Sequence, residues 1–369
     1  MYDCIVIGAG IAGAACARKL AEEAGKKVLV IERRSHVGGN CYDVLDEYGI
    51  LIHEYGPHIF HTGLEEVYEY LSRFTEWYPF GHEVVAKVED KLIPVPFNLN
   101  TLHMVYDKEK ADLLEKKLIE AYGEGSRVPI MKLRENDDPD IREIAQYVYE
   151  NVFLKYTMKQ WGQKPEEISP EVTGRVPVLI SYDNRYFQDK YQAIPAEGYT
   201  KMAERMLDNP LIRTELNTDF NDVRGSTDYE RLFYTGPIDE FFDFELGELP
   251  YRSLDIVFRR HDRAFYQSGP QINYPENYDF TRSVEYKYYL DEQTAQTIVS
   301  EEYPQAYEAG RNERYYPVPD AKNHELYRRY RRKADGLEKV YFAGRLGDYK
   351  YYNMDEAVKR ALELFEEIR

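Results

Sequence analysis

The chain has 369 residues, of which 43% are hydrophobic and 31% charged, so two or three structural units of a globular protein are expected. A net charge of −18 opposes binding to nucleic acid or to an anionic membrane surface. No apolar run reaches the roughly 18 residues of a transmembrane helix, and the first predicted strand leaves no room for a signal peptide. Cysteine occurs three times, at Cys4, Cys16 and Cys41, which predicts free thiols and a cytoplasmic location without membrane insertion.

The first predicted elements form a nucleotide-binding unit. An apolar strand over 4–7 leads into Gly8-x-Gly10-x-x-Gly13 and a helical stretch, and a second apolar strand ends at Glu32, nineteen residues after Gly13. The glycines allow a tight turn and close approach to a pyrophosphate at the helix N-terminus, and the acid is placed to bind ribose hydroxyls. A glycine-rich turn in an ordinary βαβ unit is the alternative, but strand, helix, strand and acid in this order favour dinucleotide binding.

The residues after Glu32 bear on which dinucleotide is bound. A second glycine pair, Gly38-Gly39, follows six residues after the acid. This extension resembles the FAD-binding flavoproteins related to amine oxidases, in which the glycines let the chain pass close to the cofactor. We therefore expect FAD.

The remaining elements alternate between helical and strand patterns without an internal repeat. Periodicity and turn residues predict, in chain order, a helix over 65–74, a hairpin of 84–88 and 92–95, helices within 99–158 including 110–121 and 140–156, a Pro/Gly-rich loop over 162–177, strands within 211–244, 252–265 and 271–289, a strand over 340–343 and a helix over 354–368. The loop is long enough to form a lid. The basic run 328–333 is interpreted as a solvated helix face.

These elements predict an α/β protein with a Rossmann-like FAD-binding domain of the amine-oxidase-like class, a helical insertion domain and an antiparallel sheet domain. The predicted boundaries are 1–80, 195–225 and 330–369 for the discontinuous FAD-binding domain, 99–190 for the helical domain with its lid near 162–177, and 81–98 with 226–329 for the sheet domain.

One helical stretch carries an unusual face. Phe153, Tyr156, Thr157, Gln160 and Trp161 follow at helical spacing and combine three aromatic rings with a hydroxyl and an amide. A core stripe is the simpler interpretation, although a core gains nothing from unsatisfied polar groups.

Two histidines lie in an apolar, strand-like segment. His58 and His61 flank Ile59-Phe60, and their spacing without nearby acids argues against a metal site. Both could equally be buried core histidines whose ring nitrogens are hydrogen-bonded.

Seven short strings, taken together, resemble the UDP-galactopyranose mutase family across nearly the whole chain, in the family's order. The strings are Tyr55-Gly56-Pro57-His58-Ile59-Phe60-His61-Thr62, Lys155-Tyr156-Thr157 with Gln160-Trp161, Gly174-Arg175-Val176-Pro177, Asn184-Arg185-Tyr186-Phe187, Thr281-Arg282, Tyr315-Tyr316-Pro317 and Gly344-Arg345-Leu346-Gly347.

The resemblance implies an isomerase that interconverts UDP-galactopyranose and UDP-galactofuranose for cell-surface polysaccharide. It implies reduced FAD as cofactor, a covalent flavin N5–galactose adduct, no net redox change and a homodimer. The rival is a flavin oxidoreductase of the amine-oxidase or desaturase type, which would need oxidised flavin and an apolar substrate tunnel.

The resemblance also assigns residues to the substrate. Tyr156 would stack on uracil, and Arg175 and Arg282 would hold the diphosphate, each through charge-assisted hydrogen bonds. The catalytic set is then Arg175, Arg282, His61 and Tyr351. The substrate-binding set is Phe153, Tyr156, Thr157, Trp161, Arg175, Tyr186, Asn273, Arg282, Tyr316 and Tyr351.

The cofactor-binding residues combine the glycine motif with segments that the resemblance adds. They are Gly8, Gly10, Ala12, Gly13, Glu32, Arg33, Gly39, Asn40, His58, Ile59, Phe220 on a predicted strand, Arg345, Asn353 and Met354. Asn353 precedes a helix and has Glu356 three residues on, close to a capping box. Many family members have Asp at this position, so no carboxylate role is carried over to it. No metal site is expected.

Overall fold

The computed structural model describes residues 2–168, 177–225, 228–276, 278–318 and 320–368. Two compact units emerge from the chain, each discontinuous in sequence. The first comprises Met1–Phe80, Asp189–Tyr251 and Arg314–Arg369, and the second comprises Gly81–Gln188 and Arg252–Glu313.

The first unit is organised around a parallel sheet in the order β12 (Ile212–Glu215), β2 (Val28–Ile31), β1 (Cys4–Ile7), β13 (Arg231–Tyr234) and β19 (Val340–Phe342). Every residue of β1 and β2 is buried, as expected for parallel strands covered on both faces. This sheet confirms the predicted Rossmann-like class.

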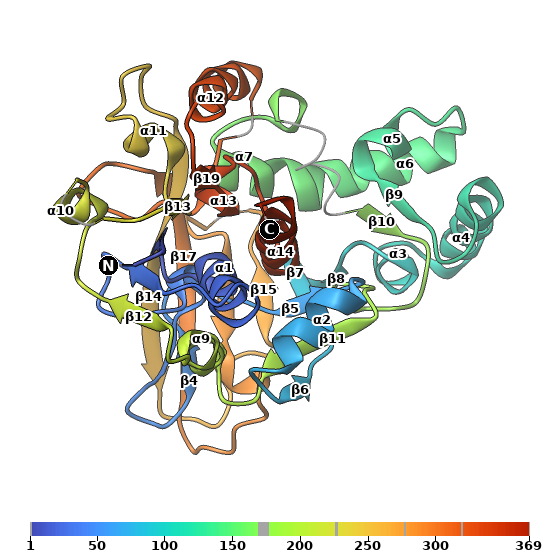
Figure 1. Cartoon of the computed structure of the whole chain (residues 1–369). Helices are drawn as coiled ribbons and strands as arrows, with labels where there is room; N and C mark the ends of the chain where they lie inside the picture. The colour runs from blue at the N-terminus through green and yellow to red at the C-terminus, as the bar shows by residue number, and fades with distance from the viewer. Residues whose placement is uncertain (1, 169–176, 226–227, 277, 319, 369) are drawn as a thin grey trace. The chain divides into compact units, whose positions relative to one another are not determined.

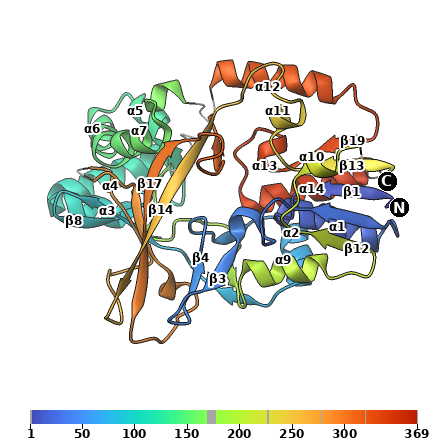
Figure 2. The same ribbon diagram turned by 90° about the vertical axis from the view of Figure 1, so that its left-hand side faces the viewer.

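Helices pack against this sheet through their apolar sides. Small and apolar residues of α1 (Ile11–Glu22), α9 (Tyr199–Leu207) and α14 (Met354–Ile368) join strand residues such as Val6 and Val30 in one core. Figure 2 shows α1 and α9 beside β1 and β12. The helix α14 begins and ends at the predicted residues.

Two sequence-based expectations within 211–244 are wrong. The strand β13 was expected in the antiparallel sheet domain, but Cys4 to Ile7 pair with it in parallel, because its buried Leu-Phe-Tyr run continues the nucleotide-binding sheet. Phe220 was expected on a strand but begins the short helix α10 (Phe220–Val223), because Asp219 caps it by accepting a hydrogen bond from the Asn221 N–H.

Smaller elements complete the first unit. They are the helices α2 (Glu65–Ser72), α11 (Ile238–Phe241), α12 (Ala321–Ala334) and α13 (Gly344–Gly347), the hairpin β3 (Asp43–Leu45) and β4 (Leu51–His53), and the antiparallel sheet β5 (Phe60–Thr62), β11 (Tyr191–Pro195) and β6 (Trp77–Pro79). The basic run 328–333 lies on α12 with most of its charged side chains exposed, as predicted.

The second unit contains the strands β14 (Tyr251–His261), β17 (Thr297–Ala306), β16 (Arg282–Glu285), β15 (Gln271–Asn273), β7 (Val84–Val88) and β8 (Lys91–Val95), adjacent in this order. Pairing is antiparallel except between β15 and β7. The predicted hairpin of 84–88 and 92–95 is confirmed, with Glu89 at a positive φ of 52° in its turn.

Helices of the same unit pack on β7 and β8 through a second core. They are α3 (Leu99–Val105), α4 (Lys108–Tyr122), α5 (Ile130–Arg134) and α6 (Pro139–Val148), accompanied by the strand pair β9 (Arg127–Pro129) and β10 (Pro177–Leu179) (Figure 1). The helix α7 (Lys155–Trp161) packs instead against β17. Helices and sheet thus share one compact unit, and their division into two domains stays a prediction.

The predicted helix over 140–156 is not a continuous α-helix. Residues Tyr149–Leu154 between α6 and α7 form a π-helical turn. The wider π turn, of the kind that often marks functional sites, changes the direction of Phe153 relative to the α-helical residues after it.

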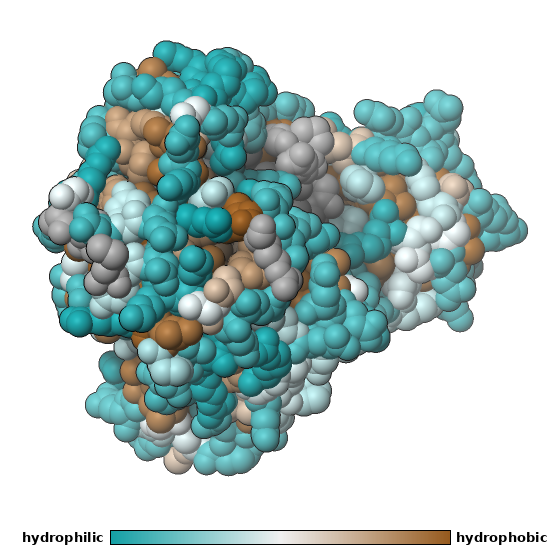
Figure 3. Space-filling view, in the orientation of Figure 1, coloured by the Kyte–Doolittle hydropathy of each residue, from teal (hydrophilic) through white to brown (hydrophobic). Residues whose placement is uncertain are grey.

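The face of the molecule in Figure 3 is largely hydrophilic, in keeping with 31% charged residues. None of the helices in the described ranges combines the length and apolar character that a bilayer-crossing segment requires.

Candidate functional site

The first candidate site is formed by the glycine turn that follows β1. Gly8 has φ +99°, and a Cβ there would lie 2.2 Å from Thr235 Oγ1. A Cβ on Gly13 would lie 1.9 Å from the Gly8 carbonyl oxygen, so only glycine lets α1 pack this close to the strand. Both positions shape the turn through backbone geometry alone.

The N-terminus of α1 is open to a bound anion. Gly10 occupies the N-cap position without a side-chain cap, and a Cβ on Gly39 would lie 2.9 Å from the Gly10 Cα. The helix N-terminus therefore offers amide donors and a positive dipole end, in a cradle that only glycines leave clear. These features fit a pyrophosphate.

Glu32 is fixed at the end of β2. Its side chain is 7% exposed; Oε2 accepts from the Ala9 N–H at 2.8 Å and Oε1 accepts from the Arg34 N–H at 2.9 Å. Each carboxylate oxygen keeps lone pairs for further donors. This arrangement fits ribose hydroxyls beside the glycine turn.

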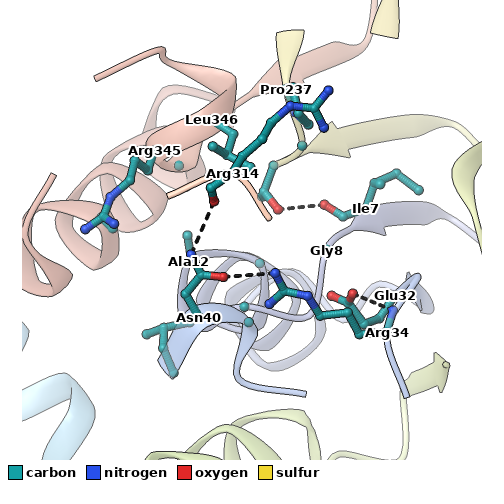
Figure 4. A pocket seen from close by; sticks show the side chains of 18 of the residues that line it. Ile7, Gly8, Ala12, Glu32, Arg34, Asn40, Pro237, Arg314, Arg345 and Leu346 are labelled. Atoms are coloured by element: carbon teal, nitrogen blue, oxygen red, sulfur yellow. Dashed lines mark hydrogen bonds between the residues drawn. The ribbon is translucent and has the colours of Figure 1, made fainter. Parts of the chain in front are cut away.

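These elements line one pocket of the first unit (Figure 4). All the predicted cofactor-binding residues line this pocket except Ile59. The arrangement supports the predicted roles without testing them directly.

Several further residues, outside the predicted cofactor-binding set, also line the pocket. They are Ile7, Ile11, Ile31, Arg34, Gly38, Cys41, Thr218, Asp219, Tyr234, Thr235, Gly236, Pro237, Glu240, Arg314, Tyr315, Gly344, Leu346, Tyr352 and Ala357. Arg314 is the most informative of them, because it is 5% exposed, pairs with Glu240 at 2.8 Å, and accepts from Asn40 Nδ2 at its carbonyl oxygen. Arg314 directly precedes Tyr315-Tyr316-Pro317, and this position in the sequence could have identified it as a pocket residue.

Arg345 organises the C-terminal side of the pocket. Its guanidinium donates to the carbonyl oxygens of Tyr352 at 2.6 Å and Tyr315 at 3.3 Å. It also lies 5.4 Å from the ring centre of Tyr316 and 5.3 Å from that of Tyr351, and these two rings contact each other edge to face. Arg345, which is predicted to bind the cofactor, thus orients Tyr316 and Tyr351, which are predicted to bind the substrate.

The helix α14 presents its N-terminus to the same pocket. The Asn353 N–H donates to Glu356 Oε2 at 2.8 Å, which is the backbone half of the expected capping box. Asn353, Met354 and Ala357 line the pocket, so the positive end of the helix dipole faces it.

The two histidines have different surroundings. His58 lines the pocket, and its Nδ1 donates to the Gly56 carbonyl oxygen at 2.8 Å. His61 does not line the pocket; its Nδ1 lies 2.8 Å from Asp189 Oδ2. Of the two, only His58 lines the pocket.

In the second unit, three polar side chains form a row across adjacent strands. Asn273 on β15 pairs with Arg282 on β16, and Arg282 pairs in turn with Glu302 on β17. Side chains of directly opposed residues point to the same face of a sheet. We call Asn273, Arg282 and Glu302 the polar row.

A buried acid supports the arginine of this row. Glu302 is fully buried, and its Oε2 lies 2.7 Å from Arg282 Nε, whose side chain is 20% exposed. A buried carboxylate requires such a partner, because removing either charge leaves the other uncompensated. The pair fixes a guanidinium that stays partly exposed.

Four residues predicted to bind the substrate lie in the π turn and in α7 of the same unit. Phe153 and Trp161 are each 8% exposed, Thr157 is 6% exposed, and Tyr156 is half-buried. We call these four residues the aromatic turn. Arg252 caps the end of α7 by donating to the Gln160 carbonyl oxygen at 2.9 Å.

The predicted substrate residues are divided between the two units. The polar row, the aromatic turn and Tyr186 belong to the second unit, while His61, Tyr316 and Tyr351 belong to the first. The Tyr186 ring contacts Phe187 edge to face. Arg175 and half of the predicted lid, residues 169–176, lie outside the described residues.

Metal-binding clusters and reactive cysteines are both absent from the described part of the chain. Those residues contain no group of three or more His, Cys, Asp or Glu able to hold a metal ion. Burial raises the pKa of Cys4 to about 11 and the pKa of both Cys16 and Cys41 to about 12, so the thiols stay protonated.

The parallel sheet, the glycine turn and the acid after β2 define a dinucleotide-binding protein, and its structural neighbours are flavoproteins. A crystal structure of reduced UDP-galactopyranose mutase matches with a TM-score of 0.74 at 16% identity, covering 100% of this chain and 94% of that one. A putrescine oxidase variant matches with a TM-score of 0.59 at 11% identity, covering 100% and 98%. The protein thus has the amine-oxidase-like flavoprotein fold.

Sequence comparisons identify the family. A model of UDP-galactopyranose mutase matches residues 151–351, and a model of an NAD(P)-binding Rossmann-like domain matches residues 6–74. A probable UDP-galactopyranose mutase of Klebsiella pneumoniae is 35% identical over 367 residues, which cover 98% of this chain and 94% of the relative. A dTDP-fucopyranose mutase of Escherichia coli is 34% identical over 371 residues, covering 98% and 97%. The chain belongs to the UDP-galactopyranose mutase family and is an isomerase.

Proposed function

We propose that this protein interconverts UDP-galactopyranose and UDP-galactofuranose with reduced FAD as its cofactor. The polar row is the observation that carries the substrate assignment, because a guanidinium backed by a buried carboxylate is a fixed anion site. A planar guanidinium donates two parallel hydrogen bonds to phosphate oxygens, which suits the diphosphate of a nucleotide sugar.

FAD is the flavin that best fits the pocket. The N-terminus of α1 supplies amides for the pyrophosphate, and Glu32 supplies a carboxylate for the adenosine ribose. Asn353 and the N-terminus of α14 would stabilise negative charge on the reduced isoalloxazine. Bound reduced flavin would supply an electron-rich N5 nucleophile for the anomeric carbon of galactose.

The chain's own residues would bind and orient the nucleotide sugar. Tyr156 would stack on uracil, with Phe153, Thr157 and Trp161 around it, and Arg282 would hold the diphosphate as it departs and returns. Arg175, outside the described residues, would add the second guanidinium. Asn273, Tyr186, Tyr316 and Tyr351 would contact the sugar and its linkage. His61, held by Asp189, would complete the predicted catalytic set.

The test is incubation of the flavin-loaded protein with UDP-galactose after reduction with dithionite, followed by chromatographic separation of pyranose and furanose forms. We expect interconversion only with reduced flavin, and the flavin should remain reduced after many turnovers. An oxidoreductase of the amine-oxidase type would instead require oxidised flavin and consume an acceptor. Absence of furanose with a fully reduced protein would refute the proposal.

A second substrate deserves a parallel assay because of one relative. The dTDP-fucopyranose mutase of Escherichia coli has nearly the same identity to this chain as the UDP-galactopyranose mutase of Klebsiella pneumoniae. We therefore propose dTDP-fucopyranose as the alternative substrate. Comparing kcat/KM for the two sugars decides between them.

We also propose that the protein is a cytoplasmic homodimer, as the family resemblance implies. Light scattering coupled to gel filtration would give the mass in solution. A mass equal to the 43.5 kDa of one chain would refute the dimer.

A further inference from the structure

Lys159, on α7 between Thr157 and Trp161, is bound to the main chain of a distant segment. Its ammonium group donates to the carbonyl oxygen of Tyr274, to that of Tyr278 at 3.1 Å and to that of Phe280 at 3.1 Å. A lysine ammonium has three N–H donors, so each donor has one main-chain acceptor here.

The segment that receives these hydrogen bonds connects two strands of the substrate site. It begins directly after Asn273 on β15 and ends just before Arg282 on β16. Its aromatic rings pack together, with Tyr274 4.7 Å from Phe280 between ring centres. The carbonyl groups of Tyr274, Tyr278 and Phe280 need hydrogen-bond donors where the packed rings exclude water, and Lys159 supplies them.

A second lysine of α7 contacts the same segment. Lys155, one helical turn before Lys159, forms an ion pair with Glu276. Its side chain is 55% exposed, so solvent screens this pair, and it contributes little on its own. The half-buried Lys159 is therefore the principal connection between helix and segment.

We propose that Lys159 is a positioning residue for nucleotide-sugar binding, which locks the segment 274–280 to α7 and so fixes Arg282 relative to the aromatic turn. This inference rests on the proposed function, since it assumes that Tyr156 and Arg282 bind the base and the diphosphate of one ligand. A ligand held at two points loses affinity when the spacing between those points varies, because binding must then order them.

The charge state of Lys159 is consistent with this role. Burial lowers the pKa of Lys159 to about 8, while the carboxylates of Asp279 and Glu276 act in the opposite direction. Most of the protein therefore carries the ammonium form with its three donors at neutral pH.

The test compares Lys159→Met with Lys116→Met in the flavin-loaded protein. Met keeps an unbranched chain but removes all donors, while Lys116 is 72% exposed on α4 and makes only a surface pair with Glu120. Calorimetric titration with UDP measures affinity, and hydrogen exchange of the peptide spanning 271–285 measures the order of the segment. We expect the Kd for UDP to rise about tenfold in Lys159→Met, which corresponds to about 1.4 kcal/mol, and exchange in this peptide to accelerate. Lys116→Met should change neither.

Chemical rescue separates positioning from general destabilisation. Lys159→Cys followed by alkylation with bromoethylamine restores an ammonium at nearly the original length. Burial raises the pKa of the three native thiols to between about 11 and 12, so they react slowly with the reagent. Alkylation should recover both the UDP affinity and the slow exchange of the segment.

The outcomes distinguish this inference from the proposed function. If the wild-type protein binds UDP but Lys159→Met leaves both affinity and exchange unchanged, the inference is refuted and the proposed function is unaffected. Faster exchange across the whole second unit without rescue would also refute it, because Lys159 would then serve stability only. A wild-type protein that binds no UDP would overturn both.

Discussion

The glycine turn of the proposed flavin pocket in the first unit depends on backbone geometry, whereas the residues proposed to bind the nucleotide in the second unit would act through their side chains. In the pocket, Gly8, Gly13 and Gly39 matter because a Cβ would collide with neighbouring atoms. In the polar row, Arg282 matters because Glu302 on the adjacent strand holds it. At a site formed by backbone geometry, almost any substitution of a turn glycine should disrupt binding. At a site formed by side chains, each substitution should remove only the contribution of that one side chain.

The largest expected effect is that of Gly13→Ala, which tests the backbone site. The new Cβ would lie 1.9 Å from the Gly8 carbonyl oxygen, so α1 must move away from β1. We expect a loss of about 3 kcal/mol or more in the free energy of unfolding, together with loss of bound flavin. Urea denaturation and the flavin absorbance of the purified protein measure the two effects.

Gly25→Ala is the matched control for this substitution. Gly25 also has a positive φ, +63°, but a Cβ there would meet nothing within 4 Å. The free energy of unfolding should fall by only about 1–2 kcal/mol, because a non-glycine residue is strained at positive φ. The protein should retain its flavin fully. Equal flavin loss in both variants would contradict the role of close packing at Gly13.

Arg282→Ala tests the side-chain site and should have the next largest effect. It removes the guanidinium that is proposed to bind the diphosphate and leaves Glu302 buried without its partner. Loss of a charged contact to the departing diphosphate should lower kcat/KM by about 10²–10³-fold, while flavin binding stays normal. Arg185→Ala, at an exposed arginine paired with Asp183, is the control and should keep its activity.

Two related substitutions sharpen this result. Arg175→Ala should reduce turnover to a similar extent if Arg175 supplies the second guanidinium. Glu302→Gln should cost less, about tenfold in kcat/KM, because the amide preserves the shape and loses only the charge. Full activity in both arginine variants would refute the diphosphate assignment.

Tyr156→Ala is expected to act on binding alone. Stacking of an aromatic side chain on a base contributes about 1–3 kcal/mol, so the Kd for UDP should rise at least fivefold. Tyr156→Phe keeps the ring and should bind UDP like the wild type. If both variants bind UDP equally well, uracil stacks elsewhere.

The contrast between the two sites also explains what the sequence could predict. The glycine turn, β2 and Glu32 follow one another within forty residues, so local spacing was enough to place them and to predict the fold class. The parallel pairing of β13 was missed because its apolar run is too short to distinguish a parallel strand from an antiparallel one. The cross-strand partner Glu302 depends on strand register, which periodicity alone does not give. The pairing of Arg314 with Glu240 joins residues 74 positions apart in the sequence, which local spacing does not predict.

The smallest expected effect concerns the pH dependence of stability in the first unit. Asp355 near the start of α14 is 8% exposed, and burial raises its pKa, while the hydrogen bond from Thr62 Oγ1 at 2.8 Å acts in the opposite direction. Because the native state then binds this proton more readily than the unfolded chain, the contribution of Asp355 to stability falls as pH rises from about 4 through its raised pKa. Thr62→Val removes the donor, so the fall in the free energy of unfolding between pH 4 and pH 7 should deepen by about 1 kcal/mol.

Thr75→Val, at a buried threonine that donates only to the Glu76 carbonyl oxygen, should leave the pH dependence unchanged. Parallel urea denaturation curves for the three proteins would test this, and identical pH slopes for Thr62→Val and the wild type would contradict the role of the hydroxyl.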